Sequence, residues 1–535
     1  MGNHLQKLPD GMARYPAWSA LALGLIGACA YPPLHLWPLG LAALAGFIWL
    51  IHQAPTWRAA LRRGWLFGWA HLTLANNWIA TAFTYQAEMP AALGWLAVPL
   101  LCIYLAWYPA LAALAAHSLA RERPLWAFGL VLAGAWIVTE WLRGWVFTGY
   151  PWPPVGLMLL GGWSAPGLAM VLPWAGTYAL SGLALLLAAS LLWALTERRW
   201  LVFGGIALAA SAGMLADPLT SRQDSALRYT LVQPLIPQDE INDGSKYEEQ
   251  FQRIARLTAK NRDTSRLVLW PESAVPDYLE DGYPERYYLL MTARGDPAYA
   301  RERIGQVIGP QSTLLTGVVN LDIGTRKDGT IGAVSARNSV LGLNGAGAIT
   351  HHYAKAHLVP YGEYLPMKPL LEPLGLARLV AGTVDYDPGP GPRTLDLGKH
   401  GRAGIQICYE IVFSGHVADR ANRPDYIFNP SNDGWFGLWG PPQHLAQARL
   451  RAIEEGLPVL RSTTTGISAV IDADGVVRGS IASGKAGALH GRIPAAKPPT
   501  LFARLGHALT LAWAAVLLAL GAGLPRLLAR RAIGR

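Results

Sequence analysis

Three separate stretches of the chain end in side chains that together suit acyl-transfer chemistry. Glu272 closes the run LVLWPE, Lys355 stands in YAKAHLVPYGE, and Cys408 stands in GIQICYE. Each follows a short apolar or β-branched run, and open α/β sheets gather their active sites at the carboxyl ends of such strands. The pattern therefore predicts that a folded sheet brings a carboxylate, an amine and a thiol together.

The three groups suit one another because a thiol alone is a weak nucleophile at neutral pH. Near neutral pH a free thiol is only slightly ionised, so it needs a base or a nearby positive charge to become a good nucleophile. Glu272 can take the thiol proton, and Lys355 can supply the charge. Lys355, helped by backbone N–H groups beside Cys408, can then stabilise the oxyanion that forms when the thiolate attacks a carbonyl.

Each of the three residues also has a non-catalytic explanation when it is taken alone. Glu272 can cap a helix, Lys355 can be a solvated charge in a hairpin, and Cys408 can be core packing behind an apolar strand. The other two cysteines, Cys29 and Cys102, lie inside apolar segments, so no disulfide framework is indicated. The joint order of the three groups favours the catalytic interpretation.

The region that holds these residues has the pattern of an α/β domain. Short β-branched or apolar runs, such as residues 229–232, 266–270 and 403–407, are separated by Gly, Pro, Asn and Asp. They alternate with helical stretches such as 247–260 and 444–455. We expect helices that cover a largely buried sheet.

The rest of the chain is apolar enough to lie in a membrane. The sequence is 52% hydrophobic and 15% charged, with 22 Trp, and its apolar residues concentrate before residue 217 and after residue 500. About 20 apolar residues cross a bilayer. We therefore predict a polytopic α-helical domain of about eight transmembrane segments, at residues 16–32, 36–53, 64–84, 91–118, 125–147, 172–195, 200–216 and 503–524.

The connections between these segments alternate in charge. Arg62 and Arg63 follow the second segment and Arg198 and Arg199 follow the sixth, whereas residues 31–37 contain no Lys or Arg. Basic loops tend to stay cytoplasmic, so both termini are predicted in the cytoplasm and residues 217–500 outside it. The net charge of +10 does not indicate nucleic-acid binding, because the basic residues form short clusters between apolar runs rather than one stripe with aromatic residues.

These features resemble the bacterial apolipoprotein N-acyltransferases, a membrane branch of the nitrilase or carbon-nitrogen hydrolase superfamily. The resemblance rests on the order Glu, Lys, Cys, on the flanks WPES, YAKAHLVPYGE and CYE, and on the apolar envelope, and it extends over essentially the whole chain. Residues 140–149 and 429–436 also look like family sequence. After QPLIPQ the family commonly carries a Lys-Trp pair, whereas residues 239–247 here are DEINDGSKY.

The resemblance implies a domain organisation. Residues 1–217 would form a transmembrane domain of seven helices, and residues 225–495 a nitrilase-like αββα sandwich on the periplasmic side of the bacterial inner membrane. Residues 500–535 would form a C-terminal transmembrane helix and a cytoplasmic tail.

The resemblance also implies a two-step reaction. An acyl chain passes from a phospholipid to Cys408 as a thioester, and then to the N-terminal diacylglyceryl-cysteine of an apolipoprotein, the last step of lipoprotein maturation. Glu272 would be the general base, Lys355 the cation beside the oxyanion and Cys408 the nucleophile. The supporting residues would be Glu363, Tyr409 and Glu410.

Two other classes of protein remain to be weighed. A membrane-tethered nitrilase-type amidase acting on a small amide would share the three catalytic residues, and dependence on a phospholipid donor would distinguish it. A transporter with an extracytoplasmic binding domain leaves the Glu/Lys/Cys order unexplained. No metal or other cofactor is implied, since His351, His352 and His357 lack a partner set at ligand spacing.

Overall fold

The computed structural model describes residues 11–85, 91–217, 223–260, 262–326, 328–371, 373 and 384–533. The chain divides into two compact units. The helical unit comprises residues 1–80, 92–219 and 499–535, and the sheet unit comprises residues 81–91 and 220–498. Residues 86–90, between the third and fourth predicted segments, and residues 218–222, between the first two predicted domains, lie outside the described residues.

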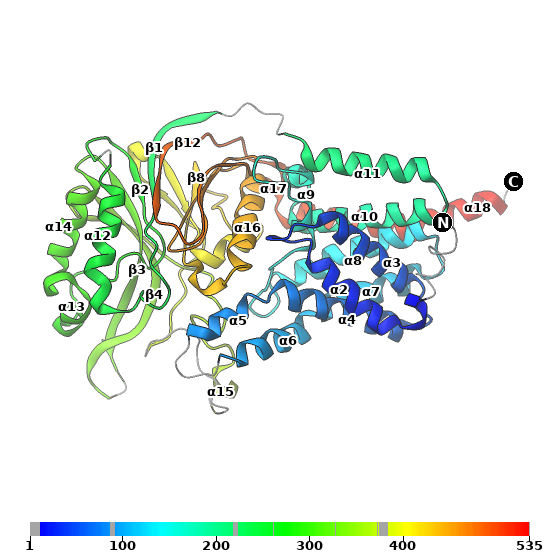
Figure 1. Cartoon of the computed structure of the whole chain (residues 1–535), viewed down its shortest axis with the longest axis horizontal. Coiled ribbons are helices and arrows are strands. Elements are labelled where there is room, and N and C mark those ends of the chain that lie inside the picture. The colour runs from blue at the N-terminus through cyan, green and yellow to red at the C-terminus, as the bar shows by residue number, and fades with distance from the viewer. Residues whose placement is uncertain are drawn as a thin grey trace. The chain divides into compact units, whose positions relative to one another are not determined.

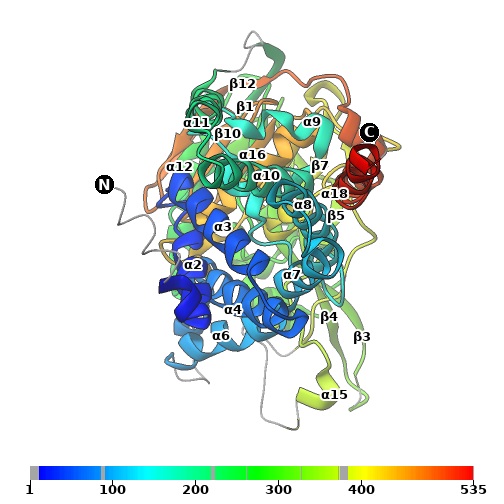
Figure 2. The same ribbon diagram turned by 90° about the vertical axis from the view of Figure 1, so that its right-hand side faces the viewer.

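The helical unit is built from apolar helices that pack through small residues. Gly64 leaves room for Ala110 and Ala113, and Gly24 lies so close to the backbone of Phe67 that a Cβ there would come within 2.4 Å of its carbonyl oxygen. Figure 2 shows the first helices of the chain gathered with α7, α8 and α10 into a bundle. The longer helices are α2 (Pro16–Ala28), α3 (Trp37–His52), α4 (Trp57–Ala75), α6 (Leu93–Leu105), α7 (Trp107–Ala120), α8 (Leu125–Arg143), α10 (Thr177–Thr196), α11 (Trp200–Leu215) and α18 (His507–Ile533).

Shorter helical turns connect them. They are α5 (Ile79–Ala82), η2 (Val155–Leu159), η3 (Leu168–Val171), α9 (Leu172–Ala175) and α17 (Leu501–Leu505).

The lengths of these helices correct the prediction of about eight membrane-spanning helices. Within the described residues, four helical stretches are long and apolar enough to cross a membrane, at residues 93–120, 125–143, 177–196 and 507–524. The helices α2, α3 and α11 have 13 to 16 residues, and at 1.5 Å per residue they rise about 20–24 Å, less than the ~30 Å of a hydrocarbon core. The helix α4 has 19 residues but carries three arginines in its first two turns.

The fourth predicted segment, at residues 91–118, is interrupted. The structure has α6 and α7 there, separated by Ala106 alone. Pro109 has no N–H to donate to the carbonyl of Leu105, and this missing hydrogen bond accounts for the break.

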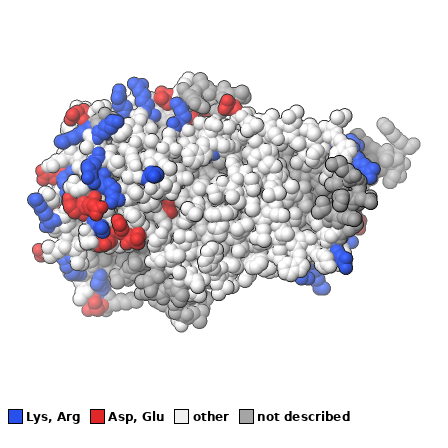
Figure 3. Space-filling model, in the orientation of Figure 1, with Lys and Arg blue, Asp and Glu red and all other residues white. Residues whose placement is uncertain are grey.

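Charge is unevenly distributed over the helical unit. On the face drawn in Figure 3, the middle of this unit shows no Lys, Arg, Asp or Glu, and Lys and Arg gather at one end. An uncharged band with basic residues at its edge is typical of a protein embedded in a bilayer.

The sheet unit contains two six-stranded sheets. The first has the order β12-β1-β2-β3-β4-β5 and the second the order β11-β10-β9-β8-β7-β6. In the first sheet β1, β2 and β3 run parallel, and in the second β7, β8 and β9 run parallel; the remaining pairs are antiparallel. The strands are β1 (Asp224–Gln233), β2 (Leu267–Leu269), β3 (Thr313–Thr325), β4 (Ile331–Asn344), β5 (Ile349–Ala354), β6 (Thr394–Asp396), β7 (Arg402–Ile405), β8 (Tyr426–Ser431), β9 (Val459–Thr463), β10 (Ser468–Ile471), β11 (Val477–Ile481) and β12 (Gly487–Pro494).

The two sheets share one hydrophobic core, in which Leu231 and Leu269 of the first sheet are buried with Phe428 and Leu460 of the second. A second core lies on the other face of the first sheet, where Trp270 is buried among residues of α12 and α14. Figure 1 shows α12 (Tyr247–Thr258), α13 (Glu285–Met291) and α14 (Pro297–Ile308) along the first sheet and α16 (Gly440–Glu455) beside the second. This helix–sheet–sheet–helix order confirms the predicted αββα class.

Candidate functional site

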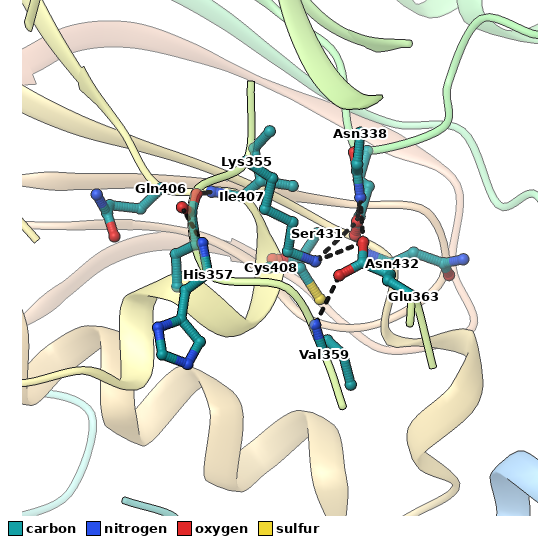
Figure 4. A network of polar contacts seen from close by, with 12 residues as sticks. Asn338, Lys355, His357, Val359, Glu363, Gln406, Ile407, Cys408, Ser431 and Asn432 are labelled. Atoms are coloured by element: carbon teal, nitrogen blue, oxygen red, sulfur yellow. Dashed lines mark hydrogen bonds and ion pairs between the residues drawn. The ribbon is translucent and has the colours of Figure 1, made fainter. Parts of the chain in front are cut away.

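The predicted catalytic residues all follow strand ends in the sheet unit. Glu272 comes three residues after β2, Lys355 directly follows β5, and Cys408 comes three residues after β7. All three are buried, with exposed fractions of 6%, 1% and 5%. Figure 4 shows the side chains of Lys355, Glu363 and Cys408 pointing toward one another. The structure therefore brings the thiol, the amine and the carboxylates into one site.

Glu272 is held by two hydrogen bonds and one ion pair. Its Oε1 accepts a hydrogen bond of 2.7 Å from Asn338 Nδ2, and its Oε2 accepts one of 2.7 Å from the backbone N–H of Asn432. The Nζ of Lys355 lies 3.8 Å from Oε1. Gly317 on β3 makes room for this loop, since a Cβ there would come within 2.5 Å of the Glu272 Cα.

Lys355 lies between two carboxylates. Its Nζ donates a hydrogen bond of 2.9 Å to Oε1 of Glu363 and is also within ion-pair distance of Glu272. Burial by itself disfavours the ammonium, but Glu363 and Glu272 outweigh it and raise the pKa of Lys355 above its ordinary value. The lysine is therefore a fixed positive charge.

Glu363 is in turn oriented by the backbone. Its Oε2 accepts a hydrogen bond of 2.7 Å from the N–H of Val359, four residues earlier. Its Oε1 also accepts one of 2.8 Å from Asn338 Nδ2.

Asn338, in β4, is a site residue that the sequence analysis missed. Its amide donates to both Glu272 and Glu363, at 2.7 Å and 2.8 Å, and its backbone carbonyl accepts from the N–H of Lys355 at 2.8 Å. One side chain thus spaces the two carboxylates that flank the lysine. The sequence feature that could have indicated it is a polar Asn inside the strand-like run SARNSVLG.

Cys408 opens the short helix η8 (Cys408–Val412) in a left-handed conformation, with φ of +49°. Such a φ is costly for a residue other than glycine and is found at functional sites where the surroundings enforce it. Burial and the negative charges of Glu272 and Asp433 raise the pKa of the thiol well above its ordinary value, while Lys355 and the N–H of Asn432 act in the opposite direction. The resting residue is therefore a protonated thiol.

The carboxyl of Glu272 also has a shifted pKa. Burial raises its pKa above the ordinary value, and the nearby Glu363 adds to this, although Lys355 partly offsets both. The raised pKa makes Glu272 a stronger base than an ordinary glutamate, which favours transfer of a proton to it.

Glu410 ties the segment after β5 to the Cys408 turn. Its Oε1 accepts from the N–H groups of Ala356 (2.7 Å) and His357 (3.2 Å), and its Oε2 accepts from that of Ile407 (2.7 Å). Tyr353 donates its hydroxyl to the same carboxyl at 2.9 Å. Burial raises the pKa of Glu410 to about 7. Glu410 thus fixes the backbone on both sides of the site without facing the thiol.

Tyr409, the last of the predicted supporting residues, is buried in an aromatic group. Its ring meets that of Phe413 edge-on, with centroids 5.1 Å apart, and lies 6.1 Å from that of His357. The side chain packs behind the Cys408 turn.

A metal site finds no support in the residues that the structure describes. No group of three or more His, Cys, Asp or Glu side chains there is arranged to hold a metal ion. Of the three neighbouring histidines, His352 pairs with Glu280 at 2.7 Å on the surface and His357 stacks on Phe413. The site contains a thiol, two carboxylates and a fixed cation, a set that suits acyl transfer through a covalent intermediate.

Comparison with known proteins gives two family matches. Residues 23–190 match the apolipoprotein N-acyltransferase N-terminal domain, and residues 231–495 match the carbon-nitrogen hydrolase domain.

Individual relatives match along nearly the full chain. The apolipoprotein N-acyltransferase of Rhodopseudomonas palustris is 32% identical over 94% of this chain and 95% of its own length. That of Bradyrhizobium diazoefficiens is 34% identical over 94% of both chains. Among solved structures, Nit3 of Saccharomyces cerevisiae, a member of the nitrilase superfamily, covers 52% of this chain and 93% of its own, with 18% identity and a TM-score of 0.34.

Proposed function

The chain belongs to the apolipoprotein N-acyltransferase family, membrane acyltransferases of the carbon-nitrogen hydrolase superfamily that act in lipoprotein maturation, and from this premise we propose how its residues carry the reaction. Cys408 is the acyl carrier, Glu272 the general base and Lys355 the cation that faces the oxyanion. The observation that carries the proposal is the buried Lys355 ammonium between two carboxylates, with the Cys408 thiol pointing toward it.

In the first step Glu272 takes the proton of the thiol, and the sulfur attacks an ester carbonyl of a phospholipid. The negative charge that forms on the carbonyl oxygen is stabilised by Lys355 and by the backbone N–H of Tyr409, the residue after the nucleophile. Collapse of this intermediate breaks the ester bond. The leaving alkoxide takes the proton from Glu272, so a lysophospholipid departs and a thioester remains on Cys408.

In the second step the N-terminal amine of a diacylglyceryl-modified apolipoprotein attacks the thioester. The amine gives its proton to Glu272, and the amide forms as the Cys408 thiolate leaves. The thiolate then recovers the proton from Glu272, which restores the resting enzyme. A thioester intermediate thus divides one difficult acyl transfer into two easier ones.

Glu363, Tyr409 and Glu410 support this chemistry. The contacts of Glu363 favour a role in keeping Lys355 charged and in place. Those of Glu410 favour a role in holding the segments that carry Lys355 and Cys408 at a fixed separation. Tyr409 supplies the N–H beside the nucleophile and packs its ring behind the turn.

We further propose the arrangement of the chain in the bacterial inner membrane. Residues 1–217 and 500–535 are the membrane-embedded parts, with both termini cytoplasmic, and residues 225–495 are the periplasmic catalytic domain. A membrane location suits substrates with acyl chains, because moving a chain from the bilayer into water costs about 0.8 kcal/mol per CH₂ group.

The test uses purified protein in detergent and a phospholipid with a labelled acyl chain. We expect the denatured protein to retain label that hydroxylamine removes, and we expect Cys408→Ala to retain none. Absence of label on intact wild-type protein would overturn the thioester mechanism. The membrane-tethered amidase is not favoured, since relatives aligned over nearly the whole chain are named apolipoprotein N-acyltransferases.

A further inference from the structure

A buried polar cluster contacts the backbone of the Cys408 turn. It consists of Asp433 at the start of η9 (Asp433–Phe436), His444 in α16 and Arg461 in β9. Their exposed fractions are 2%, 0% and 0%. Burying a charged group this deeply destabilises the fold unless the group is paired, so the contacts within the cluster have to offset the loss of hydration.

Arg461 and Asp433 form a buried ion pair within the cluster. The Nη2 of Arg461 donates to Oδ1 and Oδ2 of Asp433 at 2.7 Å and 2.6 Å, and its Nη1 donates to Ser431 at 2.8 Å. Burial alone would raise the pKa of Asp433, but Arg461 holds it below its ordinary value. The pair is thus a fixed ionic support at the end of β8.

His444 connects this support to the nucleophile. Its Nδ1 lies 3.0 Å from both Asp433 Oδ1 and Arg461 Nη2, and its Nε2 lies 3.1 Å from the carbonyl oxygen of Cys408. A carbonyl oxygen can only accept a hydrogen bond, so Nε2 carries the proton whichever neighbour pairs with Nδ1. Burial and Arg461 lower the pKa of His444, which favours the neutral ring with its proton on Nε2.

Holding the Cys408 carbonyl also determines the direction of the next N–H group. The Cys408 carbonyl and the Tyr409 N–H belong to one planar trans peptide, in which they point in opposite directions. With the carbonyl bound to His444, the Tyr409 N–H points away from α16. Cys408 adopts a φ of +49°, a conformation that an unsupported residue would leave readily.

We infer that His444, supported by Asp433 and Arg461, is a positioning residue that fixes the Cys408–Tyr409 peptide and so aims the oxyanion-binding N–H of Tyr409. The inference rests on the proposed role of Cys408 as the acyl carrier. His444 lies behind the turn and is fully buried, so it acts through the peptide and does not touch the substrate.

Two substitutions at His444 separate this role from packing. His444→Leu keeps a buried side chain but removes the donor, whereas the amide nitrogen of His444→Gln can occupy the place of Nε2. We expect His444→Leu to slow formation of the acyl-enzyme about 10- to 100-fold, because a misdirected oxyanion donor loses transition-state stabilisation. His444→Gln should stay within about fivefold of wild type, because it keeps the donor.

A second readout distinguishes the oxyanion donor from the thiol itself. Alkylation of Cys408 by iodoacetamide displaces iodide and develops no oxyanion. We therefore expect the Cys408-dependent alkylation rate of His444→Leu to remain near the wild-type rate, and the phospholipid concentration that gives half-maximal acylation to remain unchanged. Cys408→Ala gives the background from the other two cysteines.

The matched control is Gln447→Leu. Gln447 lies one turn later on α16, is equally buried, and forms no hydrogen bond within the described chain. This variant should form the acyl-enzyme at nearly the wild-type rate. The inference would be overturned if acyl-enzyme formation slowed as much in Gln447→Leu, or in His444→Gln, as in His444→Leu. It would also be overturned if the alkylation rate of His444→Leu fell as much as its acylation rate. Each of these results would show that α16 only packs against the turn.

A further variant displaces the cluster without removing a functional group. A Cβ at Gly466 would come within 2.2 Å of Asp433 Oδ2 and 2.5 Å of its Cβ, so Gly466→Ala has to shift Asp433. We expect slower acylation in this variant as well, which keeps the inference testable if His444→Leu does not fold. Wild-type acylation at full rate in a folded Gly466→Ala would contradict it. Failure of the wild type itself to form a thioester would instead overturn the proposed function.

Discussion

At the scale of single residues, the site keeps a lysine charged between two carboxylates and a thiol neutral beside them. Lys355 is within ion-pair distance of Glu272 and Glu363, and both carboxylates accept from the single amide of Asn338. Burial and the negative charge nearby disfavour a resting thiolate, so in the proposed mechanism the sulfur becomes nucleophilic when Glu272 takes its proton. A thiol that is ionised only during reaction is protected from adventitious oxidation.

The raised pKa of Glu272 predicts the pH dependence of acylation. A protonated carboxyl cannot accept the thiol proton, so the rate should fall as the pH drops through the pKa of Glu272. Because that pKa lies above its ordinary value, the fall should occur at higher pH than a normal glutamate titrates. The measurement is the rate of thioester formation from labelled phospholipid across the acidic range.

Glu272→Gln provides the comparison. The substitution keeps the shape of the side chain. We expect the rate of thioester formation to drop by about 10²–10⁴-fold, the range for loss of a general base. The fall of the rate at acidic pH, the acidic limb of the pH–rate profile, should also disappear. Asp281→Asn, which changes an exposed carboxylate of the same unit, should leave both unchanged. An acidic limb that persists in Glu272→Gln would assign the titration to another group.

At the scale of elements, the site depends on how closely strand ends and loops approach one another. Glu272 follows β2 and crosses the neighbouring β3 at Gly317, where only a hydrogen fits beneath its backbone. Lys355 follows β5 and is joined to the Cys408 turn by the Glu410 carboxyl. The active groups are therefore fixed by the register of two sheets rather than by one loop.

Gly317→Ala should test this close approach. The added Cβ would come within 2.5 Å of the Glu272 Cα and 2.8 Å of the Pro271 carbonyl oxygen, so the loop has to move and carry the general base with it. We expect a folded protein whose thioester forms at least about tenfold more slowly, since small displacements of a catalytic group have large kinetic effects.

The control for this substitution lies on the same strand. A Cβ at Gly324 would meet only the methyl groups of Val334, at 3.2 Å, and a side chain can yield where a backbone cannot. Gly324→Ala should therefore acylate at close to the wild-type rate. Equal rates for Gly317→Ala and wild type would mean that the position of Glu272 does not depend on β3.

At the scale of the whole molecule, apolar helices and an α/β sandwich suit the proposed reaction between two lipid-bearing substrates. Inside the helical unit, Arg143 donates to the carbonyls of Trp152 and Pro153 at 3.1 Å and 2.9 Å, and Glu140 accepts from the N–H of Val155 at 2.9 Å. The pair thus satisfies the backbone polar groups of a proline-rich loop. Unsatisfied groups of this kind are costly wherever water is excluded.

The proposed orientation predicts the accessibility of cysteines placed on opposite sides of the membrane. Lys260 is exposed on the sheet unit, and Arg14 is exposed near the N-terminus, which the proposed orientation places in the cytoplasm. In intact spheroplasts, a membrane-impermeant maleimide should label Lys260→Cys and not Arg14→Cys. Permeabilised membranes should allow both to react. The unsubstituted chain gives the background, and the reverse pattern would contradict the orientation.

The sequence by itself determined the fold class and the family, and it predicted the residues that supply the chemistry. Glu272, Lys355 and Cys408 were predicted from residue type and from their places after strand-like runs, because side-chain chemistry and strand periodicity are local properties of a chain. Glu363 and Glu410 were expected as supporting residues through the resemblance; Glu363 contacts Lys355, and Glu410 contacts the segments that carry Lys355 and Cys408. The apolar composition likewise indicated membrane helices.

Only the tertiary structure decided how these groups meet and which others join them. Asn338 lies within a strand, and Asp433, His444 and Arg461 lie on three elements. Their contacts depend on sheet register and helix placement, which no local pattern specifies. Some helix ends were also beyond the sequence pattern, since composition indicates an apolar stretch but not the turn that ends α2. Contacts between distant residues are properties of the packed molecule.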